Sequence, residues 1–181
     1  MTLIVVIILL ALLVLWGISI QNKLVKSDEL CKNALKQINV QQVSRYDAIA
    51  ALVKLTREYA SYESETLQKV IEARKITSSA NPTVADINAN EAALREMSAR
   101  LIAIAEKYPD LKANENYAKA MDSIKEYEEN VRLARMTFND TVTKYNNQVR
   151  MFPGSLVASI LNFPAREYLA EDNTKKDYPA I

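Results

Sequence analysis

Histidine is absent from this chain, and its absence removes much of the usual chemistry of active sites. Without histidine there is no common general base near neutral pH, no serine–histidine or cysteine–histidine nucleophile pair, and no histidine ligand for zinc or a di-iron centre. Only two glycines occur, too few for a glycine-rich phosphate-binding loop. The single cysteine excludes an intramolecular disulfide. We therefore predict a protein that is not an enzyme and that binds no cofactor, metal ion or small-molecule substrate.

The chain also lacks a large net charge, because its 23 Lys and Arg residues are balanced by 22 Asp and Glu residues. Without a basic field, nucleic acid is not an expected partner. The scarcity of glycine and proline favours long, uninterrupted helices.

What the chain does have is an apolar run at its beginning, where the first charged side chain is Lys23. Fourteen of the 18 residues 3–20 are Leu, Ile or Val. As a helix this run is about 27 Å long, close to the hydrocarbon thickness of a bilayer. We predict a transmembrane anchor over residues 1–22 that contacts membrane lipids. Its representative side chains are Leu3, Ile8, Leu13, Trp16 and Ile20.

The flanks of the run predict its orientation. Met1 and Thr2 carry no basic side chain, whereas Lys23 and Lys26 follow the run. Because positive residues stay on the cytoplasmic side, we expect the N-terminus outside and the rest of the chain in the cytoplasm. The alternative is a secretory signal cleaved near Gly17 and Ser19, but the run is long and lacks a basic start.

Apolar residues recur at three- and four-residue steps over residues 23–77, 84–107 and 115–150, which predicts three long amphipathic helices. Thr83, followed by Asp86, forms a capping-box pattern, and Asn114 is an expected cap for the third helix. The predicted fold is all-α: one transmembrane helix, an antiparallel bundle of these three helices over a domain of residues 23–170, a short C-terminal helix, and a flexible tail over residues 171–181.

The short apolar stretch over residues 156–163 has two interpretations. It is too short to span a bilayer, so it either forms a helix that closes one end of the bundle or lies against a membrane or a partner. The residues expected to make such a contact are Leu156, Ile160, Leu161 and Phe163.

Arg45 lies within the apolar stripe of the first helix, between Ile38 and Leu52. A buried guanidinium needs an anionic partner, and the third helix offers Asp140 and Glu128. We favour a structural polar network over a switch or a ligand clamp. Its candidate members are Arg45, Glu128, Asn139 and Asp140.

The segment from Tyr108 to Asn114 is a second polar candidate. Pro109 ends the preceding helix, and Asp110 favours a turn. A loop with such defined chemistry is either a tight helix connection or an interaction loop for a partner, and the sequence favours neither interpretation.

Several local strings together carry a resemblance to a known family. Two blocks are the most specific, residues 108–117 with Tyr-Pro-Asp-Leu-Lys-Ala-Asn-Glu-Asn-Tyr, and residues 138–152, which begin Phe-Asn-Asp and end in Phe. With Arg45-Tyr46-Asp47 and Arg166-Glu-Tyr168, they make the chain similar to the LemA family of bacterial membrane proteins over nearly its whole length. Asn39, Ser44 and Tyr62 stand where family members often have Asp, Arg and His, so conclusions that rest on those side chains do not transfer.

The resemblance implies an N-terminal anchor in the bacterial cytoplasmic membrane, a cytoplasmic helical bundle and no established enzymatic activity. We expect a scaffold or interaction module that contacts copies of itself or other membrane proteins. The alternative is a membrane-remodelling or lipid-sensing protein, since relatives of this family include a magnetosome-membrane protein.

Overall fold

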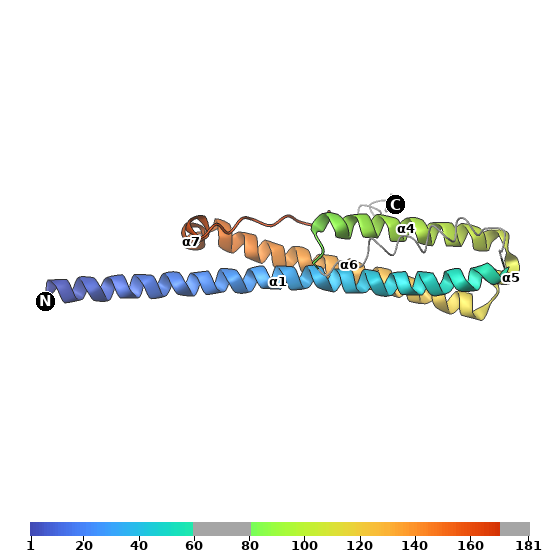
Figure 1. The fold of residues 1–181 in the computed structure, drawn as a ribbon, viewed down its shortest axis with the longest axis horizontal. Coiled ribbons are helices and arrows are strands. Elements are labelled where there is room, and N and C mark those ends of the chain that lie inside the picture. Colours follow the sequence, from blue (N-terminus) through green and yellow to red (C-terminus); the bar gives the residue numbers. More distant parts are fainter. Residues whose placement is uncertain (60–80, 171–181) are drawn as a thin grey trace, which may run out of the picture. The chain divides into compact units, whose positions relative to one another are not determined.

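The computed structural model describes residues 1–59 and 81–170, and the regular elements within these residues are all helices (Figure 1). They are α1 (Thr2–Tyr59), α4 (Val84–Lys107), α5 (Pro109–Lys112), α6 (Glu115–Arg150) and α7 (Gly154–Ile160). The expected end of the first helix at Thr77 and the tail over residues 171–181 lie outside the described residues.

The apolar run and the first amphipathic stripe belong to one helix, α1, which resolves whether the anchor continues into the following helix. No proline interrupts it, since the first proline of the chain is Pro82. Among the described helices, α1 is the one long and apolar enough to cross a membrane, judged by length and composition, and its most apolar stretch is not buried. Its large side chains from Leu3 to Ile18 are exposed, from 74% at Leu3 to 46% at Ile18.

The chain forms two compact units. Unit 1 comprises Met1–Ala34 and Thr137–Tyr168, and the described part of unit 2 comprises residues 35–59, 81–136 and 169–170. Helices α1 and α6 each contribute a segment to both units. The domain boundaries expected from the sequence stay a prediction.

The core of unit 2 is built from the stripes that the sequence predicts. Ile49 and Leu52 of α1 are buried with Leu94 and Leu101 of α4, and the cluster includes Ile124 of α6. Leu111 of the short α5 is fully buried in the same cluster, which fixes the connection between α4 and α6.

Within unit 2, α4 runs parallel to the neighbouring part of α1. Gln42 donates to the backbone oxygen of Ile87 (3.0 Å), and Arg45 donates to Glu91 (3.0 Å), so residue numbers rise together along the two helices. The expectation that the second long helix packs antiparallel to the first is therefore wrong. Apolar residues at three- and four-residue steps fix which face of a helix is buried but not the direction of its neighbour, so the periodicity alone does not distinguish parallel from antiparallel packing.

The direction of α6 is opposite. Arg45 of α1 lies 3.4 Å from Glu128, whereas Tyr59, farther along α1, accepts a hydrogen bond from Asn114 at the start of α6 (2.9 Å). Numbers that rise in one helix thus fall in the other, so α6 runs antiparallel to this part of α1, as expected.

The helix starts follow local rules. The Thr83 side chain accepts from the Asp86 backbone (3.2 Å), and the Asp86 carboxylate accepts from the Thr83 backbone (2.8 Å), which confirms the capping box of α4. The hydrogen bonds that the Asp86 carboxylate accepts from the backbone N–H of Thr83 and from its hydroxyl (2.7 Å) lower the pKa of Asp86. Asn114 accepts from the backbone of Asn116 and of Tyr117, so it caps α6 as predicted.

Candidate functional site

The principal buried polar cluster of unit 2 surrounds Arg45, which is 1% exposed. Its Nη1 donates to Glu91 Oε1 at 3.0 Å and its Nη2 to Glu128 Oε2 at 3.4 Å. Glu91 is itself nearly buried, and its Oε1 also accepts from Arg95 Nε at 3.0 Å. Gln42, fully buried, donates to Glu91 Oε2 at 3.4 Å. Two guanidinium groups and two carboxylates thus compensate one another inside the unit.

The sequence placed Arg45 correctly in the buried stripe and offered Glu128, but it missed Glu91. A signal for Glu91 exists, because this residue lies four positions after Ile87 and three before Leu94 on the stripe of α4. A carboxylate in the buried stripe of one helix is a reasonable ion-pair partner for an arginine in the buried stripe of another. Asn139 and Asp140 belong to unit 1, and they are not among the partners of Arg45 that the structure gives.

Unit 1 holds a second polar cluster, where residues 164–168 lie against α6 and α1. The buried side chain of Asn146 donates to the backbone oxygen of Arg166 (2.9 Å) and accepts from its backbone nitrogen (2.8 Å). The Arg166 guanidinium pairs with Asp28 of α1 (2.7 Å) and lies over the ring of Tyr145. Burial raises the pKa of Tyr145, and its hydroxyl donates to the backbone oxygen of Pro164 (2.9 Å). Asn146 therefore fixes a segment of the chain, which is a structural role.

Cys31 is fully buried in α1, and burial raises the pKa of its thiol. The protonated thiol is a weak nucleophile. In the described part of the chain, no group of three Cys, Asp or Glu side chains is arranged to hold a metal ion.

The candidate interaction loop, residues 108–114, is a well-packed connection between α4 and α6. Tyr108 packs partly against the core, Leu111 is buried, and Asn114 uses its side chain to cap α6 and to reach Tyr59. Pro109 and Asp110 are exposed, as are Lys112 and Ala113, so a partner can reach these four residues of the segment.

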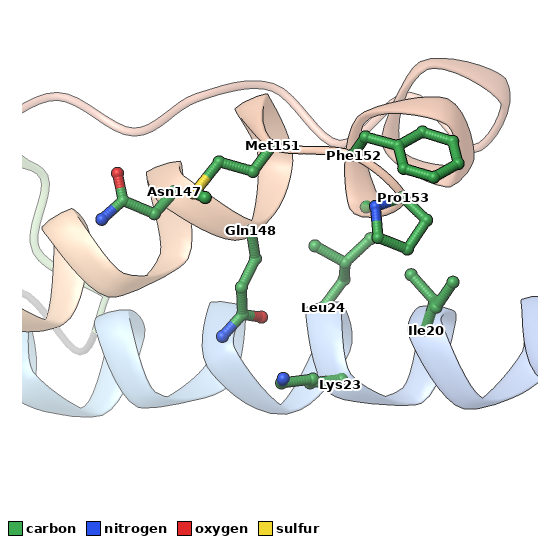
Figure 2. Close-up of a pocket in the computed structure, with 9 residues that line it drawn as sticks. Ile20, Lys23, Leu24, Asn147, Gln148, Met151, Phe152 and Pro153 are labelled. Atoms are coloured by element: carbon green, nitrogen blue, oxygen red, sulfur yellow. The ribbon is translucent and has the colours of Figure 1, made fainter.

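The residues around α7 that the sequence offers for a lipid or partner contact are mostly exposed. Leu156, Ile160 and Leu161 are exposed, and Phe163 is half-buried. A pocket of about 240 Å³ lies between α7 and α1 and is lined by Ile20, Leu24 and Pro153 among others (Figure 2). This volume is smaller than the roughly 300–1,000 Å³ of typical ligand sites.

Comparison with known proteins places the chain in a family. A sequence model of the LemA family matches residues 34–181. Magnetosome protein MamQ 2 of Paramagnetospirillum magneticum is 31% identical over 72 residues, which are 40% of this chain and 26% of that protein. Magnetosome protein MamQ of Magnetospirillum gryphiswaldense is 32% identical over 72 residues, again 26% of its length. The chain thus matches about a quarter of the length of these relatives. Because the family model covers most of the chain, the resemblance is confirmed, and the chain belongs to the LemA family.

Proposed function

We propose that this protein is a single-pass membrane protein whose helical region serves as a non-enzymatic scaffold or interaction module on the cytoplasmic face of the bacterial membrane. The observation that carries the proposal is the exposed apolar run at the start of α1, which continues without a break into the charged, packed remainder of the same helix. Membership of the LemA family and the similarity to magnetosome proteins support a membrane-associated role.

We also propose that the protein has no enzymatic activity. Histidine is absent from the sequence, and the buried ionisable groups of unit 2 are used to neutralise one another. Exposed charge on α6 is paired along the helix, as in Lys119 with Glu115 (2.7 Å). These features fit a protein that acts by contact.

The orientation predicts a labelling pattern. In a Cys31→Ala background, a membrane-impermeant maleimide should label Thr2→Cys in intact cells and label Lys144→Cys only after the inner membrane is opened, because lysines follow the apolar run. Mass-tagged maleimide and gel analysis measure both. Labelling of Lys144→Cys from outside would reverse the proposed topology.

Self-assembly predicts crosslinking between copies. A photoreactive side chain at the exposed Val40 or Ile102 should give homodimer bands in intact cells, and the yield should fall when residues 1–20 are deleted, since the anchor concentrates copies in two dimensions. Leu101, next to Ile102 but 1% exposed, is the matched control. If neither exposed position crosslinks to another copy, the protein does not assemble with itself through these faces.

A membrane-remodelling or lipid-sensing protein is the alternative function. The exposed apolar side chains around α7 favour it, because such a protein must contact lipid outside its anchor. It requires that these side chains reach the bilayer.

A further inference from the structure

An apolar surface lies around α7 in unit 1, and we name it the α7 apolar surface. Phe152 is 78% exposed and Ile160 is 73% exposed, so these large side chains face outward although unit 1 has a core available. The surface consists of Met151, Phe152, Leu156, Ile160 and Leu161. Large apolar side chains that are exposed together within residues 151–161 of a small unit indicate a contact with something other than water.

The sequence of this region also lacks charge. Residues 151–165 are fifteen consecutive positions without Asp, Glu, Lys or Arg. The polar side chains among them are small and neutral, such as Ser155, Ser159 and Asn162. A water-facing surface of this chain looks different, because the exposed face of α6 before Arg150 carries lysines, arginines and carboxylates. The composition of residues 151–165 suits an environment that penalises charge.

The position of the surface identifies the occupant. The pocket beside α7 places Phe152, Pro153 and Gly154 next to Ile20 and Leu24 of α1, within the same compact unit. Figure 2 shows Pro153 lying with Leu24 and Ile20, while the side chain of Phe152 extends sideways above Pro153 and does not point down toward α1. Ile20 is the last residue of the apolar run, which is about as long as the hydrocarbon layer is thick. When the run spans the bilayer, the α7 apolar surface therefore lies at the edge of the hydrocarbon.

We infer that the α7 apolar surface is a second membrane contact, inserted among the lipids of the leaflet from which α1 emerges. The inference rests on the proposed function, because it requires α1 to span the bilayer. The occupant is lipid because the surface lies beside Ile20, where the exposed apolar side chains of residues 3–18 end. The short helix and its loops are tolerated there because the interface still offers water to backbone groups that lack partners.

The inferred contact would hold unit 1 against the membrane at two places, the emerging α1 and the α7 apolar surface. The local fold supports such a rigid contact. Asn162 ends α7 in the left-handed conformation (φ 56°), and Phe163 donates back to Ala158 (2.9 Å), which closes the helix end. Asn146 then fixes the chain a few residues later.

Depth measurement with nitroxide labels tests the inference on the full chain in phosphatidylcholine–phosphatidylglycerol vesicles. In a Cys31→Ala background, single labels are placed at Ile160→Cys, at Leu10→Cys in the anchor, and at Lys144→Cys on α6. Ile160, Leu10 and Lys144 are all exposed, so the labels should leave the core intact. We expect the labels at Ile160 and Leu10 to be relaxed more by oxygen than by a water-soluble nickel chelate, and the label at Lys144 to show the reverse. A Leu156→Cys label should repeat the result for Ile160.

The outcomes separate the two proposals. If the Leu10 label is in lipid and the Ile160 label behaves like that at Lys144, the α7 contact is wrong and the anchor stands. If the Ile160 label is shielded from both reagents and shows dipolar broadening from a second label, a second copy covers the surface and the inference is overturned. If the Leu10 label is reached by the nickel chelate, the anchor itself is wrong, and the inference fails with it.

Discussion

Replacement of Glu91 by alanine should lower the free energy of unfolding by about 3–5 kcal/mol, because it leaves the buried Arg45 without its closest carboxylate. The remaining acidic partner, Glu128, is farther away at 3.4 Å, and its side chain is 51% exposed, so it neutralises the guanidinium poorly. The Nε of Arg45 has no hydrogen-bond partner in the structure, so the guanidinium depends on these two carboxylates as its acceptors. Chemical denaturation of the protein in detergent, followed by circular dichroism, measures the loss.

Two variants serve as controls for Glu91→Ala. Glu128→Ala should cost less than about 1 kcal/mol, since the Glu128 side chain is half exposed and its charge is screened by solvent. Replacement of both Arg45 and Glu91 by leucine should cost less than Glu91→Ala alone, because no unpaired charge remains inside. Equal effects of Glu91→Ala and Glu128→Ala would show that the buried pair does not stabilise unit 2.

Replacement of Gly154 by alanine should destabilise the junction between α6 and α7 by about 2–3 kcal/mol, as expected for forced overpacking. A Cβ at this position would lie 2.0 Å from the backbone oxygen of Gln148 and 3.1 Å from its carbonyl carbon. The obstacle is backbone within α6, so no side chain can move aside to relieve it. Thermal unfolding in detergent measures the effect.

Gly17→Ala is the matched control for Gly154→Ala. A Cβ at Gly17 meets no atom within 4 Å, and alanine is the better helix former by about 1 kcal/mol. We therefore expect Gly17→Ala to leave the melting temperature unchanged or to raise it slightly. If the two glycine variants behave alike, the close approach of α7 to α6 is not a constraint on this fold.

Local chemistry made much of the helical structure predictable from the sequence. The bounds of α4 and α6 agree with the predicted ranges, because each start depends on a side chain within three residues, Thr83 with Asp86 for one and Asn114 for the other. The buried stripe is likewise local, since apolar residues at three- and four-residue steps must share one face of a helix. Arg45 was recognised as buried for the same reason.

The partners of buried polar groups were harder to predict because they depend on how distant segments pack. Arg45 and Glu91 are separated by 46 residues, and Arg166 and Asp28 by 138, so no local pattern pairs them. Asn146 is a polar residue of the predicted third helix, but its function in holding Arg166 depends on where the chain goes after α7.

The sequence by itself determined that this protein is helical and that it begins with an apolar helix, because composition, periodicity and helix caps act over a few residues. Its motifs also carried the resemblance to the LemA family, which the family model confirms. The tertiary structure decided that α4 runs parallel to α1 in unit 2, that Glu91 is the closest partner of Arg45, and that Gly154 lies against the backbone of Gln148. These features follow from which helix faces meet, and many arrangements of the same amphipathic helices satisfy the same local rules.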